Sequence, residues 1–430
     1  MSEILTALLQ RLDEKIPAYD VLDKTYAGKP PLSFLAPDAR EVLGKRFGHL
    51  GSNLCRLAVT SLGERLRVIG FTRDGVSDPL AWGDWIKNDL DQTAPVGHRE
   101  ALALGSSFVI VWADEHGEPS ISVESARQVA AVRDPGTRQI VAAVKRWTTA
   151  TTTEAVLYEA DKITRYRARG VGSTTGFTVV ETIDNPLGVV PVVELSNTDR
   201  LLAEGVSEMA DTMPLQDALN KLLADMMVGS ENYARPRRYA TGIELEEDAD
   251  GNVVNPFPEG DKMMIGEDPA AKFGQLPPAD LASYEKAIRV VVEQIEAVSG
   301  LPAHYVGITS NQPPSADALR AAEASLTARA EQKQQTFGRA WERVAALAHA
   351  VRTGTDPTTV DMRVQWADPA TRSVAQEADA VVKLFQSGLL PATYALAKLG
   401  YSDDEIRDIR ADRRAEALDT AGTDLAGLIA

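Results

Sequence analysis

The chain has 430 residues, 44% of them hydrophobic and 25% charged, which are ordinary values for a folded protein of about two or three domains. Its 62 acidic and 45 basic side chains give a formal charge of −17. This charge argues against a sequence-independent nucleic-acid binder with a basic face, but it allows a protein that lets DNA pass without gripping it. The single cysteine, Cys55, excludes an internal disulfide and a thiolate metal cluster, and it fits a reducing compartment such as the cytoplasm.

Residues 1–203 predict helices followed by an antiparallel sheet. The N-terminal helix is indicated by apolar residues at helical spacing with acids between them, unlike a secretory signal: Ile4, Leu8, Leu12 and Ile16. Between residues 101 and 195, short runs rich in Val, Ile and Thr are separated by turn-forming residues, which indicates antiparallel strands. The run SFVIVWA is too short to span a bilayer, so we expect no membrane contact.

A helix is expected over residues 204–234, and a different texture follows it. After Pro214, apolar residues fall on one helical face: Leu215, Leu219, Leu222 and Met226. Residues 235–279 are rich in Pro, Gly and acids, and the sequence DADG predicts a hairpin turn there. Three arginines open this segment, and they form either a solvated surface cluster or a contact for an anion or a protein partner: Arg235, Arg237 and Arg238.

The segment 280–300 has the most regular pattern in the chain. Its apolar residues recur at intervals of three and four: Leu281, Tyr284, Ile288, Val291, Ile295 and Val298. This repeat of 3.5 residues is typical of a helix that packs along a partner helix at a shallow angle. Gly300, followed by Leu301 and Pro302, is a plausible stop signal.

An uncharged segment, residues 301–314, separates this helix from a very long one. It contains no Asp, Glu, Lys or Arg, although a quarter of the chain is charged. The segment is either a turn packed on a neighbouring helix or a loop that faces something on which charge is unfavourable. Ser315 can cap a helix over residues 315–353, whose length suggests a spine. Residues 354–400 then contain one half-buried strand and helices, and a short helical segment is expected over residues 401–430.

Catalytic and metal-binding patterns are thin. The five histidines are dispersed and include no pair at metal-ligand spacing. RGVGSTTG places its glycines one residue off the dinucleotide fingerprint, and a hairpin turn is the better interpretation. The acidic stretch 248–259 resembles a calcium loop in part, but Val253 stands where glycine makes the bend. We therefore expect no cofactor, no metal and no enzyme activity.

The order of these parts resembles the portal proteins of tailed double-stranded-DNA bacteriophages, in the branch typical of long-tailed phages. The resemblance spans roughly residues 98–407 and is most specific over residues 298–347. The motifs that carry it are VSGLP at the end of the regular helix, PPSADALRAAEASL and FGRAWERVAAL in the long helix, and EGVSEMADTMPLQDALNKLLADMM upstream.

The resemblance implies an α+β fold with parts in a fixed order. They would be a mixed wing (1–203), a first stem helix (204–234), a clip with some β structure (235–279), a second stem helix (280–300), a channel loop (301–314), a spine helix (315–353), a wing return (354–400) and a short crown (401–430).

It also implies a function and partners. Portals form a ring, usually of twelve copies, at one capsid vertex; they assemble in the host cytoplasm and become part of the virion. The terminase large subunit pumps double-stranded DNA inward through the ring, and DNA leaves through it at infection. Further partners would be head-completion adaptors, the major capsid protein and scaffolding proteins.

Two sets of site residues follow from this resemblance. The channel loop would touch DNA in transit through His304, Tyr305, Thr309, Ser310, Asn311 and Gln312. The clip would dock the terminase and the adaptor through Arg235, Arg237, Arg238, Glu244, Glu246, Glu247, Asp248 and Asp250. Two alternatives stay open at this point: an oligomeric structural adaptor that conducts nothing, and a mixed-fold enzyme with an unrecognised site.

Overall fold

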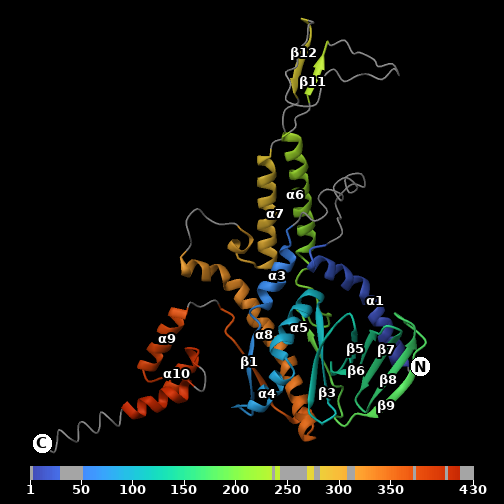
Figure 1. Ribbon diagram of the computed structural model, residues 1–430, viewed down its shortest axis with the longest axis vertical. Coiled ribbons are helices and arrows are strands. Elements are labelled where there is room, and N and C mark those ends of the chain that lie inside the picture. The colour runs from blue at the N-terminus through green and yellow to red at the C-terminus, as the bar shows by residue number, and fades with distance from the viewer. Residues whose placement is uncertain are drawn as a thin grey trace, which may run out of the picture. The chain divides into compact units, whose positions relative to one another are not determined.

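The computed structural model describes residues 3–29, 52–234, 238–242, 269–275, 281–307, 315–370, 374–401 and 405–416. The chain divides into two compact units, residues 1–369 and residues 370–430, each with its own internal contacts. Figure 1 shows the larger unit as a body of helices and sheets from which a pair of helices projects. This mixture of helices and sheets confirms the expected α+β class.

Among the described residues of the larger unit, the helices that precede its main sheets are α1 (Glu3–Tyr26), α3 (Leu54–Gly63), α4 (Pro79–Lys87) and α5 (Leu90–Leu104). The first of them packs on a sheet through Leu5, Leu8, Leu9 and Leu12, each almost completely buried. The expected stripe shares Leu8 and Leu12 with this face, but Ile4 is 43% exposed. A repeat of 3.6 residues favours the set Leu5, Leu8, Leu9 and Leu12, because a strict spacing of four drifts around the helix.

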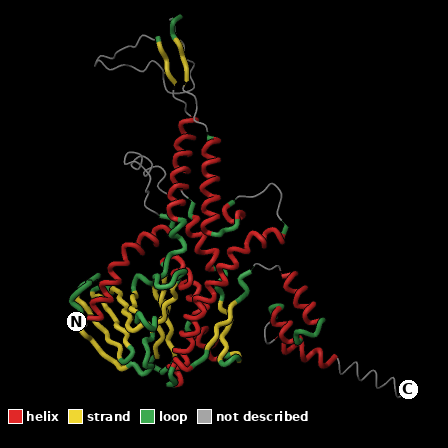
Figure 2. The backbone as a smooth tube through the Cα atoms, turned by 180° about the vertical axis from the view of Figure 1, so that it is seen from behind, coloured by secondary structure: helices red, strands yellow, loops and turns green. Residues whose placement is uncertain are grey.

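The expected antiparallel region forms two separate sheets (Figure 2). One has the order β10-β3-β4, with β3 (Ser106–Ala113), β4 (Pro119–Ser125) and β10 (Val192–Ser196). The other is a meander, β5-β6-β7-β8-β9, with β5 (Val129–Arg133), β6 (Ile140–Thr148), β7 (Thr152–Glu159), β8 (Lys162–Arg169) and β9 (Thr178–Asp184). The RGVGSTTG stretch lies at the turn between the antiparallel strands β8 and β9, as the hairpin interpretation predicts.

A third sheet joins distant parts of the chain. Its order is β13-β1-β2, with β1 (Val68–Arg73), β2 (Val76–Ser77) and β13 (Met362–Trp366). Phe71 pairs with Val364 and Arg73 with Met362. The half-buried strand expected near the end of the larger unit therefore completes a sheet that begins before the other two sheets.

The long helix α8 (Ala316–Thr353) runs through the core of the larger unit. The Ser315 hydroxyl accepts a hydrogen bond from the Ala318 amide at 3.2 Å, and Gly354 ends the helix in the left-handed conformation. Trp341 is fully buried; its ring meets Trp85 edge-on at 4.8 Å, and its indole nitrogen donates to His98 Nε2 at 2.7 Å. A short 3₁₀ turn, η2 (Pro357–Thr359), follows the helix.

Helices α6 (Met213–Ala234) and α7 (Ala282–Ser299) lie side by side in both views (Figures 1 and 2). We call this pair the stem. The first stem helix begins nine residues later than the expected residue 204. The amides of Asn197 and Glu208 donate to Gly105 and Leu102, which ties the preceding segment to α5 and its end, and Pro214 suits the first turn of a helix. The segment between the stem helices contains an antiparallel pair, β11 (Arg238–Thr241) and β12 (Lys272–Gln275).

The smaller unit is helical where it is described, with α9 (Val374–Gln386), α10 (Ala392–Lys398) and a helix over residues 405–416. Its buried apolar side chains among the described residues are Val381, Ala395 and Ile406. In the part of the chain that the structure describes, every helix falls short of the length and apolarity needed to cross a membrane.

Candidate functional site at the root of the stem

The stem helices pack through a small apolar cluster. Leu219 of α6 and Val292 and Ile295 of α7 are buried, with the side chains of Leu215, Leu223, Ile288 and Val291 packed around them. Further along, Gly229 allows close approach: a Cβ at this position would lie 3.6 Å from Leu281 Cδ2. Because this cluster is narrow, the relative position of the two helices depends on a few side chains.

The predicted seam of α7 needs one correction. Leu281, Tyr284, Ile288 and Val291 are half-buried and Ile295 is fully buried, but Val298 is 44% exposed. Val292 and Ser299 are buried instead. A straight α-helix turns 3.6 residues per turn, so a stripe with a 3.5-residue repeat drifts by about 20° per heptad. The contact face therefore moves onto positions 292, 295 and 299 toward the end of the helix.

At its C-terminus α7 turns directly onto the long helix α8. Gly300 adopts φ +68°, and a Cβ there would lie 3.1 Å from Arg329 Nη1 and 3.2 Å from Ser325 Oγ. Glycine is therefore favoured by the left-handed backbone conformation, and a Cβ would also crowd two side chains of α8. Leu301 is buried immediately after this turn. The end of the stem is fixed on the spine helix.

The uncharged segment begins as a folded turn. Residues Ala303–Val306 form the 3₁₀ helix η1, and Tyr305 packs against the main core. Arg65 donates to the Tyr305 hydroxyl at 3.1 Å and pairs with Glu323 of α8 at 3.1 Å. His304 Nε2 lies 3.4 Å from the other oxygen of Glu323. This cluster anchors the first part of the segment 301–314.

The structure thus separates the expected channel-loop residues into two groups. His304 and Tyr305 are engaged within the subunit, which agrees with the alternative of a turn packed on a neighbouring helix. Thr309, Ser310, Asn311 and Gln312 lie outside the described residues, so their contact with DNA stays a prediction. The anchored turn ends at Gly307, the last described residue before α8 is reached at Ser315.

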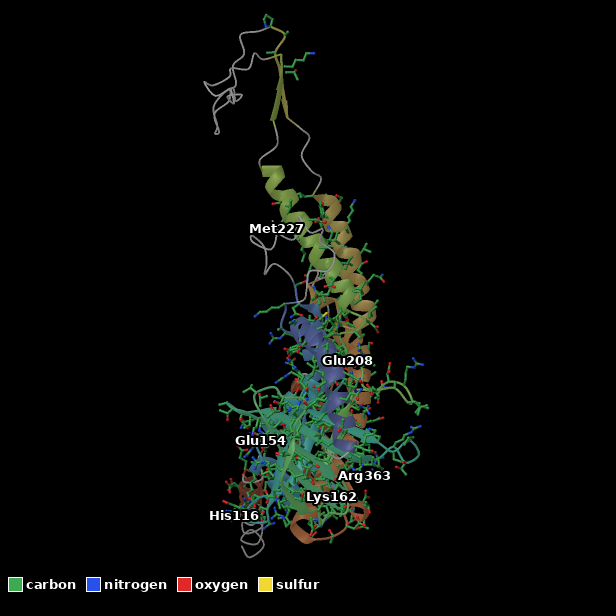
Figure 3. All side chains as sticks on the ribbon, turned by 90° about the vertical axis from the view of Figure 1, so that its right-hand side faces the viewer. His116, Glu154, Lys162, Glu208, Met227 and Arg363 are labelled. Carbon is green, nitrogen blue, oxygen red and sulfur yellow. The ribbon has the colours of Figure 1, made fainter. Side chains whose placement is uncertain are left out.

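A buried polar cluster that the sequence did not indicate joins the segment before the first stem helix to α8. Glu208, just before α6, pairs with Lys333 at 2.8 Å and with Arg329, both on α8. Lys333 also donates to Asn197 Oδ1 at 2.5 Å, and the side-chain nitrogen of Asn197 donates to Glu208 Oε1 at 3.0 Å. Burial alone raises the pKa of Glu208, but the two cations outweigh it and hold the pKa below its usual value. In Figure 3 Glu208 lies below Met227 of α6, where the stem meets the body.

Two glycines let the backbone of this junction pass close to the sheet. A Cβ on Gly205 would lie only 1.8 Å from the carbonyl oxygen of Gly105. This oxygen accepts a hydrogen bond from the backbone N–H of Asn197 at 2.8 Å. The Glu208 amide donates to Leu102 of α5 at 2.8 Å. Since α5, α8 and the segment that leads into α6 are all tied here, this junction sets where the stem emerges. We call it the stem root.

Most of the residues predicted for the clip lie outside the part of the chain that the structure describes. Arg238 begins strand β11, whereas Arg235, Arg237, Glu244, Glu246, Glu247, Asp248 and Asp250 lie outside the described residues. In the described part of the chain, no group of His, Cys, Asp or Glu is arranged to hold a metal ion. His98 is a core residue: burial lowers its pKa to about 3, so the ring is neutral and accepts the Trp341 hydrogen bond.

Comparison with known proteins decides the family. The model of the phage portal proteins of the SPP1 Gp6-like type matches residues 6–418. The chain belongs to the phage portal protein family. A portal protein of Mycobacterium phage L5 is 30% identical over 391 residues, covering 83% of this chain and 77% of that protein. The portal protein of Mycobacterium phage D29 is 31% identical over 388 residues, with the same coverage.

A solved structure described as the neck of an empty GTA particle, computed with C6 symmetry, is 14% identical, with a TM-score of 0.49. The match covers 86% of this chain and 95% of that one. Membership of a portal family confirms the resemblance seen in the sequence. The family is a structural one.

Proposed function

We propose that this portal-family chain closes with copies of itself into the ring at the unique capsid vertex, through which DNA is packaged and later ejected. The observation that supports the proposal best is the path of the chain at the stem root. Helices α6 and α7 lie side by side, Glu208 just before α6 is paired with Lys333 of the spine helix α8, and α7 ends against α8 at Gly300. The uncharged segment 301–314 connects α7 to α8. In the proposed ring, one such segment from each subunit would face the channel.

The charge of the chain suits a channel that DNA crosses without being held. Twelve copies at −17 each would carry a formal charge of 12 × −17 = −204. Such a ring repels a polyanion, while arginine or lysine on the channel wall would form ion pairs and retain it. Residues 308–314, with the sequence ITSNQPP, carry no charge and could touch moving DNA without such pairs.

The clip is the proposed docking platform. Arg235, Arg237 and Arg238, with the acidic residues from Glu244 to Asp250, would meet the terminase large subunit and later the head-completion adaptor. Reversing the three arginine charges should abolish motor docking and leave rings intact. If those variants fail to form rings, the arginines are structural. Assembly in the host cytoplasm, with scaffolding and major capsid proteins as further partners, belongs to the same proposal.

Particle images of the purified protein test the proposal directly. We expect closed rings with an axial hole wide enough for duplex DNA. A ring without such a hole, or a filament, would favour the non-conducting adaptor. A monomer with an enclosed ligand pocket would favour the enzyme.

A further inference from the structure

The helix over residues 405–416 has an unusual distribution of charge. Its sequence is EIRDIRADRRAE, and every residue is exposed except Ile406, which is 4% exposed, and Ile409, which is half-buried. The two isoleucines mark the face that packs on the rest of the smaller unit. The side chains on the other faces of the helix are exposed in the single subunit.

Successive residues of an α-helix are about 100° apart, so the charges can be placed around the helix axis. The acidic residues fall on one edge of the helix: Glu405, Asp408, Asp412 and Glu416. Three of the four arginines fall on the opposite edge: Arg407, Arg410 and Arg414. Arg413 lies between the two edges, four residues after Ile409. The face opposite the isoleucines carries Ala411 and Ala415.

This segregation is unfavourable for a helix that faces only water. Asp408 and Asp412 are four residues apart, and so are Arg410 and Arg414. Like charges at this spacing destabilise a helix, whereas a solvated helix gains stability by placing opposite charges there. The two edges are therefore stabilised most by groups of opposite sign outside the helix.

A second copy of the same helix would supply both partners. A ring of identical subunits is built from heterologous contacts, in which one surface of each subunit meets a different surface of the next. Opposite edges of one helix with opposite charge meet this requirement, because the acidic edge of one copy fits the basic edge of its neighbour. Repetition around the ring then satisfies every edge.

The rest of the smaller unit also indicates that its surface is covered in an assembly. Several of its large apolar side chains are exposed in the single subunit: Val382, Leu384, Phe385, Leu389, Tyr394, Leu399 and Tyr401. Its own buried apolar residues among those described are only three. A unit with so small a core and so much exposed apolar surface is expected to be covered in an assembly.

We infer that the helices 405–416 of neighbouring subunits lie side by side around the ring, with the acidic edge of each against the basic edge of the next. This inference rests on the proposed ring. It assigns the interface in the smaller unit to a second copy of this chain and to ion pairs between positions 408 and 412 on one copy and 410 and 414 on the other.

Disulfide trapping of the full chain tests the contact. In the double variant Arg410→Cys/Asp412→Cys, each subunit carries one thiol on each edge. Their Cβ atoms point to opposite sides of one helix, so they cannot bridge within a subunit. The native Cys55 does not interfere, because it is buried and burial raises its pKa to about 12. We expect mild oxidation of assembled rings to give a ladder of covalent oligomers on a denaturing gel.

A matched control has both thiols on one edge. Asp408→Cys/Asp412→Cys places two cysteines on the acidic edge, where the neighbour's basic edge carries none, so we expect no ladder. If the opposite-edge variant gives no ladder although its rings are seen in images, the inference is overturned and the proposed ring stands. If the wild-type chain forms no rings at all, both the proposed function and the inference are wrong.

Exchange of the two edges gives a second test that does not depend on cysteine. Asp408→Arg/Asp412→Arg should lower the salt concentration at which rings dissociate. Adding Arg410→Asp/Arg414→Asp to the same chain exchanges the charges at the four positions proposed to pair, and we expect it to move the value back toward that of the wild type. If the basic edge instead binds packaged DNA, neither variant should change the salt concentration at which purified rings dissociate, and that result would overturn the contact between copies.

Discussion

Two glutamates near the stem root have opposite electrostatic environments. Glu208 is buried between Lys333 and Arg329, and its pKa lies below the usual value. Glu296, in the last turn of α7, has its pKa raised by burial and by the neighbouring charge of Glu293. Its Oε1 atom is buried and meets no hydrogen-bond donor among the described residues, and a carboxylate at a helix C-terminus also meets the negative end of the helix dipole.

Glu208→Gln should destabilise the subunit at neutral pH, by about 3–5 kcal/mol, because it leaves two cations without their anion in a buried place. A depressed folded pKa means that the stabilisation is present above the unfolded pKa, about 4.3, and is lost as the pH falls through the folded value. Urea unfolding of wild type and variant from pH 8 to pH 3 measures this. The difference in the free energy of unfolding between wild type and variant should shrink as the pH falls. A difference that does not change with pH would show that the loss comes from packing and not from charge.

Glu296→Gln should have the opposite effect and stabilise the subunit at neutral pH, by no more than about 1 kcal/mol because the residue is partly exposed. A raised folded pKa means that the charged form costs stability above that pKa, and the cost disappears as the pH falls toward about 4.3. The same urea series gives the result. A variant less stable than wild type at pH 7.5 would contradict the assigned environment.

At the scale of the elements, the stem root requires the backbones at Gly205 and Gly105 to pass very close to each other. Gly205→Ala should destabilise the protein by about 3 kcal/mol or more, because its Cβ would overlap the Gly105 carbonyl and neither backbone can move freely. Gly229→Ala is the matched control in α6: its Cβ would make ordinary contact with Leu281, and alanine should stabilise the helix by about 0.5–1 kcal/mol. Denaturant midpoints of the two variants should move in opposite directions.

The corrected contact face of α7 predicts unequal effects at two valines. Val292→Ala should cost about 1–2 kcal/mol, since Val292 is 8% exposed and packs against α6. Val298→Ala should change the stability of the dissociated subunit by less than about 0.5 kcal/mol, because Val298 is 44% exposed. Thermal unfolding of dissociated subunits measures the stability of the subunit, and salt-induced dissociation measures the stability of the ring. If the two variants lose equal stability in the dissociated subunit, Val298 belongs to the contact face, as the 3.5-residue repeat predicts.

Local patterns predict the second stem helix and the spine closely. The sequence indicates helices over residues 280–300 and 315–353, and the structure has Ala282–Ser299 and Ala316–Thr353, because Gly300, Ser315 and Gly354 carry strong capping signals. The pairing of β1 with β13 could not be predicted, since strand partners far apart in the chain leave no local pattern. The cluster at the stem root is hidden in the sequence for the same reason: each member is an ordinary polar residue until the fold brings them together.

At the scale of the whole molecule, two charge patterns have different consequences. In the proposed ring, the net charge of −17 would act on everything that passes near the channel, whereas the segregated charges of residues 405–416 would act only on the adjacent copy. The first acts over about a Debye length, roughly 8–10 Å at physiological salt, and the second acts at contact. A change in net charge at the channel and a change in pairing at the C-terminal helix should therefore be separable by experiment.

Substitution in the uncharged segment tests the role of the channel. Asn311→Lys/Gln312→Lys should slow DNA packaging and make its rate depend more steeply on salt, because each added cation can pair with a phosphate and must release it as the DNA advances. Packaging rate is measured at several salt concentrations with wild-type motor. Asn311→Ser/Gln312→Ser keeps the segment neutral and should package at the wild-type rate. Equal rates and equal salt dependence for the lysine and serine variants would remove DNA contact from residues 308–314.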